Sequence, residues 1–222
     1  MIDLDNYKET LTKAKAKHAR LVAVSKTKPI EDILQIYSSG QRIFGENKVQ
    51  EMLRKQALLP EDIEWHMIGH LQRNKVKYIA PFISLIHGVD NPRLLAEIDK
   101  QATRNNRIID CLLQVHIAKE KTKFGFSENE LIEFFENGNF ITYQHIRICG
   151  LMGMATFSHD KKLVASEFHL LKTLFEKIKN QFFQTENTFN ELSMGMSGDY
   201  EIALNEGSTL IRIGSLIFGS RN

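Results

Sequence analysis

The chain of 222 residues is 42% hydrophobic and 25% charged, the composition of an ordinary globular protein with enough apolar side chains for a sizeable core. Its formal net charge of +2 excludes the strongly basic character of a typical nucleic-acid-binding protein. Residues 1–5 lack the basic start and apolar core of a signal peptide, and no apolar run is long enough to span a bilayer. We therefore predict a cytoplasmic protein with neither nucleic acid nor membrane among its partners.

Short apolar runs alternate along the chain with longer amphipathic ones. The short runs are typical of strands buried on both faces, and they cover residues 21–25, 43–45, 65–69, 84–89, 111–117, 146–154, 192–194 and 210–213. Helical patterns occupy residues 7–18, before the first strand, and then 30–38, 48–58, 73–79, 92–103, 128–135, 161–183 and 200–204.

Eight strand patterns, each followed by a helical or turn segment, predict an α/β fold: a single (β/α)8 TIM barrel over residues 1–222 with an extra N-terminal helix. A doubly wound open sheet is the alternative. Its usual Gly-x-Gly-x-x-Gly fingerprint is absent after the first predicted strand. In a barrel, functional residues gather where the strands end at the C-terminal face, so the residues that close each strand carry the functional argument.

Cysteine and histidine spacing does not favour a metal site. Cys111 and Cys149 lie far apart inside apolar runs, which indicates buried thiols in a reducing compartment and not a disulfide or zinc site. His66 and His70 have the i, i+4 spacing of a metal pair. No carboxylate or cysteine beside them completes a site, so we predict no metal.

Lys26 closes the first predicted strand. Strict alternation places it on one face with Val22 and Val24, and a crowded interior mouth disfavours the charged form of an amine. Such a lysine becomes nucleophilic enough to form a Schiff base. The alternative is a side chain that leaves the strand and reaches water with its ammonium group. Lys28, two residues on, is a second candidate for the reactive amine.

The last two predicted strands end in turns suited to a phosphate group. Ser193 and Ser197 supply hydroxyls in the first turn, and Gly214 and Ser215 supply donors after the last strand. Phosphate sites built from the loops after strands seven and eight recur in barrels of this type. Two ordinary strand-to-helix turns would account for the glycines but not for a serine in both turns.

Arg212 lies inside the last apolar strand, where an unpaired guanidinium is costly. Either it pairs with a buried acid such as Glu46, or it points at a ligand. A guanidinium does not give up its proton at ordinary pH, so one that faces a pyridine nitrogen keeps that nitrogen unprotonated. The ring is then a weaker electron sink.

Six motifs together resemble the pyridoxal phosphate homeostasis protein family, and they run in the expected order from the first strand to the C-terminus. They are VAVSKTKP at 22–29, FGEN at 44–47, WHMIGHLQRNK at 65–75, GLM at 150–152, LSMGMS at 192–197 and RIG at 212–214. The resemblance implies a barrel like the N-terminal domain of alanine racemase, with pyridoxal 5'-phosphate (PLP) in its mouth.

The resemblance also implies roles for individual residues. Lys26 would form the internal aldimine with PLP, Asn47 would lie beside the cofactor, and Arg212 would face the pyridine nitrogen. His66 would line the same mouth. The phosphate would be held by Ser193, Ser197, Gly214 and Ser215. Ser215 stands where the family pattern has threonine, and this change keeps the hydroxyl.

The resemblance favours a carrier over an enzyme. Alanine racemase has a second domain whose tyrosine is the base on the opposite face of the cofactor, whereas this sequence ends at Ser220, Arg221 and Asn222, a few residues after the last motif. Racemisation needs a proton removed on one face and returned on the other, and Lys26 serves one face. We therefore predict a monomeric protein that holds PLP and delivers it to PLP-dependent apoenzymes. A PLP-dependent racemase or related enzyme is the alternative; a barrel for another phosphate ester would leave Lys26 unexplained.

Overall fold

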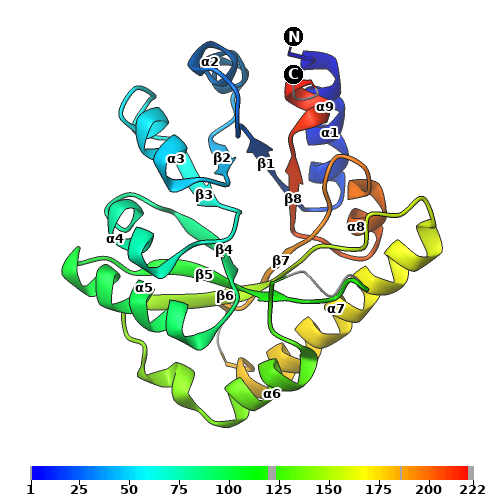
Figure 1. Cartoon of the computed structure of the whole chain (residues 1–222). Helices are drawn as coiled ribbons and strands as arrows, with labels where there is room; N and C mark the ends of the chain where they lie inside the picture. Colours follow the sequence, from blue (N-terminus) through cyan, green and yellow to red (C-terminus); the bar gives the residue numbers. More distant parts are fainter. Residues whose placement is uncertain (1, 120–123, 186, 220–222) are drawn as a thin grey trace.

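The computed structural model describes residues 2–119, 124–185 and 187–219, and the predicted tail at 220–222 lies outside them. Eight parallel strands form a closed barrel in sequence order, and β8 pairs with β1 to complete it (Figure 1). The strands are β1 (Arg20–Val24), β2 (Ile43–Glu46), β3 (Glu64–Met67), β4 (Leu85–Val89), β5 (Ile109–Val115), β6 (Ile146–Gly153), β7 (Glu191–Ser193) and β8 (Leu210–Ile213). The predicted (β/α)8 barrel is confirmed.

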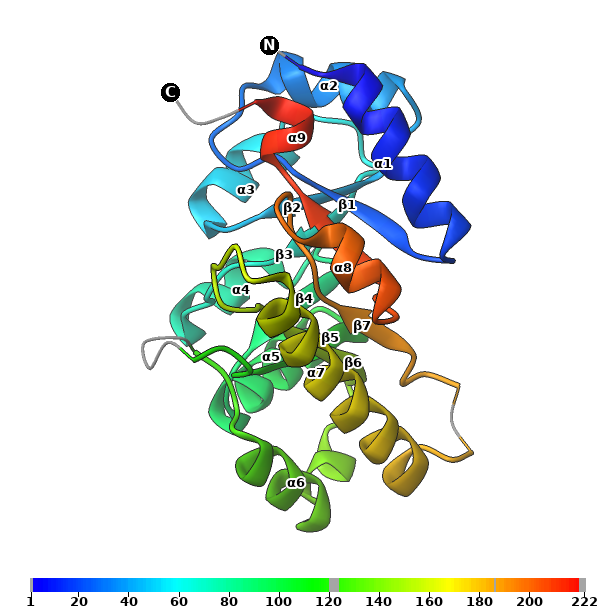
Figure 2. The ribbon, with the colours of Figure 1, turned by 90° about the vertical axis from the view of Figure 1, so that its right-hand side faces the viewer.

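Helices cover the outside of the barrel, as Figures 1 and 2 show from two directions. They are α1 (Leu4–Ala16), α2 (Ile30–Ser38), α3 (Val49–Gln56), α4 (Val76–Ile79), α5 (Pro92–Arg104), α6 (Glu128–Glu136), α7 (Lys161–Phe182), α8 (Tyr200–Asn205) and α9 (Ser215–Phe218). In the part of the chain that the structure describes, none of them combines the length and the hydropathy that a membrane crossing requires.

The N-terminal helix packs against the end of the chain. The Asp3 side chain caps α1 by accepting a hydrogen bond from the Asn6 N–H, and the Asp3 N–H donates to the Ile217 carbonyl at 2.8 Å. Helices α1 and α9 therefore lie side by side (Figures 1 and 2). The extra N-terminal helix is confirmed, although it begins three residues before the predicted start.

Two short helical segments differ from the predicted pattern. The pattern at 73–79 divides into a 3-10 turn, η1 (Arg73–Lys75), and the short helix α4. Helix α9 was not predicted because four residues are too few to display a helical period. It begins directly after Gly214, at the mouth of the barrel.

Apolar side chains form two layers. The larger cluster fills the space between strands and helices, and a small cluster lies inside the barrel around Val22, Leu85 and Leu112. The interior also holds buried polar side chains, among them His87 and Arg212, which are 0% and 4% exposed. The barrel interior is therefore partly polar, and its polar groups need partners there.

Strand β6 contains a bulge that only glycine permits. The β5–β6 register shifts between Cys111 and Leu112, and Gly150 has a φ of +151°. A Cβ at Gly150 would collide with the carbonyl oxygen of Glu191 on β7. This collision gives a structural reason for glycine in the GLM motif at 150–152.

The two cysteines are buried and free, as predicted. Burial raises the pKa of Cys149 to about 12 and that of Cys111 well above its usual range. Both groups are therefore neutral thiols at physiological pH and unreactive as nucleophiles.

Candidate functional site

A cavity of about 600 Å³ opens at the C-terminal ends of the strands. It brings together six residues predicted from the sequence: Lys26, Asn47, Ser197, Arg212, Gly214 and Ser215. These residues lie near or just after the C-terminal ends of β1, β2, β7 and β8. The two pairs of strands are far apart in sequence, but the four strands are consecutive around the closed barrel. Val22 lies in the interior apolar cluster, and Val24 and Lys26 line the cavity above it, as strand alternation predicts.

The backbone directly after Lys26 is held in an unusual conformation. Thr27 has a φ of +66°, a left-handed conformation that is costly for a β-branched residue. Its N–H donates to the Glu51 Oε1 at 2.5 Å, and the Lys28 N–H donates to the Ser25 carbonyl at 3.0 Å. The carboxylate on α3 therefore fixes the turn that carries Lys26.

Beneath this turn lies a buried group of charges centred on Lys55 of α3. The Lys55 Nζ lies 2.7 Å from each of three oxygens: the Ser25 carbonyl, Glu46 Oε1 and Glu51 Oε1. The Ser25 hydroxyl donates to the same Glu46 oxygen at 2.7 Å. Burial raises the pKa of Glu46, and the Lys55 ammonium opposes that shift. Because Glu46 pairs with Lys55, the hypothesis that it pairs with Arg212 is wrong.

Lys28 is engaged at the far end of α9. Its Nζ donates to the carbonyl oxygens of Phe218 at 2.7 Å and Gly219 at 3.2 Å, where it satisfies the C-terminal carbonyls of this short helix. Lys28 and Lys26 both line the cavity, but the Lys28 amine ties α9 to the turn after β1. The Lys28 amine therefore has a structural role at the end of α9.

Arg212 is held in the barrel interior by neutral oxygens. Its Nη1 donates to the Ser193 hydroxyl at 2.6 Å and its Nη2 to the Gly153 carbonyl at 3.1 Å. Burial lowers the pKa of Arg212 to about 10, and the negative charge of Asp199 acts in the opposite direction. Arg212 therefore remains a cation at neutral pH.

The two turns predicted to hold a phosphate are in direct contact. The Gly214 N–H donates to the Ser197 hydroxyl at 3.3 Å, which joins the turn after β8 to the turn after β7. Gly195 shapes the first turn, because its φ is +94° and a Cβ there would lie 2.6 Å from the Ala203 Cβ. No side chain caps the N-terminus of α9 among the residues that the structure describes. Hydroxyls and backbone N–H groups from both turns thus face one cavity.

Asn47 presents an unsatisfied acceptor at this cavity. Its Oδ1 is buried and has no hydrogen-bond partner within residues 2–119, 124–185 and 187–219. The Asn47 backbone is packed against Gly69, where a Cβ would lie 2.7 Å from the Asn47 carbonyl oxygen. A buried acceptor without a partner indicates that a ligand or water donates to it.

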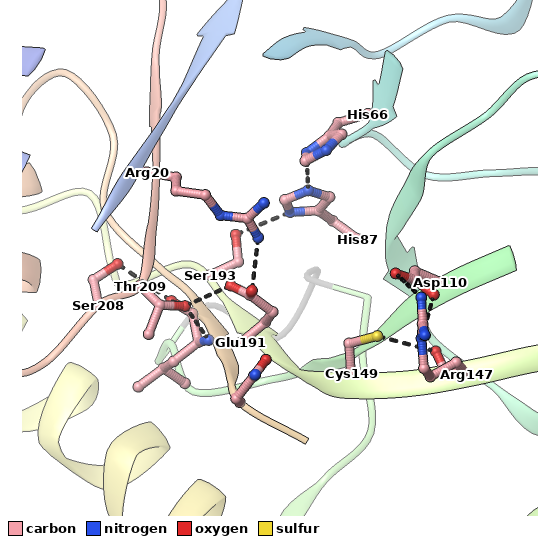
Figure 3. A network of polar contacts seen from close by, with 12 residues as sticks. Arg20, His66, His87, Asp110, Arg147, Cys149, Glu191, Ser193, Ser208 and Thr209 are labelled. Carbon is pink, nitrogen blue, oxygen red and sulfur yellow. Dashed lines mark hydrogen bonds and ion pairs between the residues drawn. The ribbon is translucent and has the colours of Figure 1, made fainter. Parts of the chain in front are cut away.

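The structure does not bring the remaining two predicted residues to the cavity surface. Ser193 is fully buried below Arg212. His66 lies in the interior with its Nδ1 3.0 Å from the His87 Nε2, and it lines a second cavity of about 340 Å³ at the N-terminal ends of the strands (Figure 3). Sequence reasoning missed His87, although the alternation of the predicted strand at 84–89 places it on one face with Leu85 and Val89.

His70 lies apart from His66. Its Nδ1 is 3.0 Å from the Asp90 Oδ2, and its ring stacks on Phe124 with 4.2 Å between the ring centroids. The i, i+4 spacing of the two histidines therefore does not bring them together, because β3 ends between them and the chain turns.

Comparison with known proteins defines the class first. Residues 2–222 match the family model described as alanine racemase, N-terminal domain. The structure is also similar to that of alanine racemase from Bartonella henselae, with a TM-score of 0.72 and 16% identity over 97% of this chain and 59% of that one. At this identity the likeness shows the fold, a barrel of the alanine racemase type.

More similar relatives narrow the class. The pyridoxal phosphate homeostasis protein of Aquifex aeolicus is 40% identical over 204 residues, which are 91% of this chain and 87% of the relative. PipY of Synechococcus elongatus has been solved without PLP, and that structure has a TM-score of 0.89 and 33% identity over 97% of this chain and 99% of PipY. It has also been solved with PLP bound, with a TM-score of 0.84 and 34% identity over 95% of this chain and 99% of PipY. This chain belongs to the pyridoxal phosphate homeostasis protein family.

Proposed function

We propose that this protein binds PLP in the C-terminal cavity and acts in PLP homeostasis, with a covalent bond between the Lys26 Nζ and the aldehyde carbon of the cofactor. This C=N bond would replace the aldehyde C=O bond, and the oxygen would leave as water with two hydrogens from the amine. The observation that carries the proposal is the meeting of an amine, a buried guanidinium and two turns rich in serine and glycine in one cavity. The PLP-bound structure of PipY, which is 34% identical to this chain, supports it.

The residues at the cavity fit the chemistry of the cofactor. PLP, when bound, supplies an electrophilic carbonyl group and a pyridine ring that also carries a phosphate. The Lys26 amine is the nucleophile, and the unsatisfied Asn47 Oδ1 accepts a hydrogen bond beside it. The phosphate group would be held by the Ser197 hydroxyl and by the turn at Gly214 and Ser215, which the Gly214 N–H joins to Ser197.

Arg212 sets the electronic character of the site. A guanidinium has five N–H donors and no acceptor, and the bonds to Ser193 and Gly153 use two of the five. A remaining N–H group donates to the pyridine nitrogen and cannot deliver a full proton to it at neutral pH. The ring consequently withdraws fewer electrons, which favours holding the cofactor over carbanion chemistry.

We propose a carrier and keep a PLP-dependent racemase as the alternative. Lys26 supplies a proton acceptor on one face of the ring, and no tyrosine is among the described residues that line the cavity. A carrier needs no second base. Delivery to PLP-dependent apoenzymes would then follow from reversible formation of the bond to Lys26.

The covalent bond is tested by incubation of the purified protein with PLP, borohydride reduction and peptide mass spectrometry. We expect a yellow protein and a reduced adduct on the peptide that contains Lys26. K26A should give no adduct, and K28A is the matched control that should still be modified at Lys26. A colourless wild-type protein, or an adduct at another lysine, would reject the assignment.

Carrier and enzyme are separated by the exchange of amino-acid α-protons into deuterated solvent. With a panel of amino acids we expect exchange far below ordinary turnover, which is about 10 per second. Exchange near that rate, abolished in K26A, would establish the enzyme and overturn the carrier.

A further inference from the structure

A chain of hydrogen bonds continues from Arg212 through the interior of the barrel. Below the guanidinium, the Ser193 hydroxyl lies 2.9 Å from the His87 Nδ1, and the His87 Nε2 lies 3.0 Å from the His66 Nδ1. The three side chains come from β7, β4 and β3, and each is at most 2% exposed (Figure 3). We call Ser193, His87 and His66 the interior chain.

The direction of every hydrogen bond in the interior chain follows from Arg212. The guanidinium only donates, so the Ser193 oxygen accepts from it and must send its own proton elsewhere. Among the described residues, His87 Nδ1 is the acceptor that lies within hydrogen-bond distance of that hydroxyl, at 2.9 Å. His87 Nδ1 is therefore unprotonated, its Nε2 carries the hydrogen and donates to His66, and His66 is protonated on Nε2.

This assignment requires both histidines to be neutral, and their surroundings favour that form. Burial lowers the pKa of His66 to about 3, and it lowers the pKa of His87 well below the usual range. The nearby positive charge of Arg212 adds to the effect at His87. A neutral His87 acts on the guanidinium through the Ser193 hydroxyl, which accepts from Arg212, and forms no ion pair with it.

We propose that His87 is a positioning residue for Arg212: it fixes the Ser193 hydroxyl as an acceptor toward the guanidinium, and His66 fixes the tautomer of His87. The consequence for PLP rests on the proposed function, because Arg212 then meets the cofactor in one orientation. His87 is not among the described residues that line the cavity, so its effect on Arg212 passes through Ser193.

Two substitutions separate this role from simple packing. In H87N the side-chain oxygen lies near the position of Nδ1 and still accepts from Ser193, but the side chain is too short to reach His66. In H87Q the longer side chain reaches the position of Nε2 and His66, but it offers no acceptor near Nδ1. Both variants remove the ring, and H87N leaves the larger void because asparagine is one methylene shorter than glutamine, so a pure packing effect would weigh more on H87N.

PLP affinity is the first measurement, by titration with absorbance detection. We expect a rise in Kd of about ten-fold for H87Q, because a hydrogen bond that anchors a charged group is lost, and of about two-fold for H87N. The absorbance maximum of bound PLP should shift in H87Q only. Changes in H87N as large as those in H87Q or larger, with matching losses of Tm, would show that His87 only fills space and would overturn the proposal.

The protein without PLP provides a readout that does not depend on the proposed function. Nitrogen NMR of the wild type should show His87 protonated on Nε2, and the Arg212 guanidinium protons should exchange with water about ten-fold faster in H87Q than in H87N. A hydrogen on His87 Nδ1 would overturn the proposal. If these results hold but the wild type binds no PLP, the proposed function fails and the role of His87 stands.

Discussion

The two ends of the barrel hold arginine side chains in opposite electrostatic settings. At the N-terminal end, the Arg20 Nη2 donates a hydrogen bond to the Glu191 Oε1 at 2.6 Å. Arg147 donates two hydrogen bonds to the Asp110 carboxylate, from Nε at 2.7 Å and from Nη2 at 2.9 Å (Figure 3). At the C-terminal end, Arg212 donates hydrogen bonds to two neutral oxygens, the Ser193 hydroxyl and the Gly153 carbonyl.

The difference separates structural polar groups from groups arranged for a ligand. The N-terminal arginines are half-exposed, so their ion pairs add little stability, and carboxylates already neutralise their charges. Arg212 is buried and keeps its charge beside a cavity that also contains Lys26. A buried guanidinium that is held by neutral oxygens and lies beside a cavity therefore marks that cavity as a strong ligand candidate.

The largest expected effect concerns acid stability and the interior chain between the two ends. The pKa values of His66 and His87 are lower in the folded than in the unfolded protein. Above about pH 6.5 both states leave these histidines neutral, but below it only the unfolded state takes up protons, so stability falls as the pH falls. The loss reaches up to about 1.4 kcal/mol per pH unit for each histidine. Urea unfolding at pH 7, 6 and 5 measures this slope, and a double H66Q/H87Q variant should flatten it.

The second prediction compares a buried charge at the C-terminal end with an exposed one at the N-terminal end. K55M removes the partner of the fully buried Glu46 and should lower the free energy of unfolding by about 3–5 kcal/mol. R20Q removes one member of an exposed pair and should cost less than about 1 kcal/mol. Chemical denaturation at pH 7 measures the free energy of unfolding of both variants. Similar losses in K55M and R20Q would mean that burial does not distinguish the charges at the two ends.

The third prediction concerns ligand affinity. R212Q should weaken PLP binding by about 10- to 100-fold, since a charge-assisted hydrogen bond is lost. R147Q, at the opposite end, should change the Kd by no more than about two-fold, as expected of a surface substitution. Titration of both variants with PLP tests the assignment of roles. A comparable loss of affinity in R147Q would contradict it.

The smallest expected effect concerns the backbone below Asn47. G69A places a Cβ 2.7 Å from the Asn47 carbonyl oxygen and should destabilise the fold by about 1–3 kcal/mol. G198A is the matched control for stability, because a Cβ there meets nothing within 4 Å, and its change should stay within about 0.5 kcal/mol. Thermal unfolding distinguishes the two. Equal Tm values would show that Asn47 can move aside freely.

Strand alternation and strand ends predicted much of the candidate site. Lys26, Asn47, Ser197 and Arg212 reach the cavity because each follows or lies in a strand whose C-terminal end forms the mouth. The resemblance implied that His66 lines the same mouth, but the structure places it deeper, against His87 and at the N-terminal cavity. It pairs with Gly45 and through it with Val24, two residues before Lys26, and this depth depends on register.

The sequence by itself determined the order of elements, the closed barrel that eight alternating patterns imply, and the small and polar residues at the strand ends. Local periodicity and turn chemistry carry that information. Only the tertiary structure decided which charges pair: Lys55 and not Arg212 meets Glu46, Lys28 binds the end of α9, and His87 supports Ser193. These contacts join residues distant in sequence, and they depend on barrel closure and on the register of neighbouring strands, which no local pattern specifies.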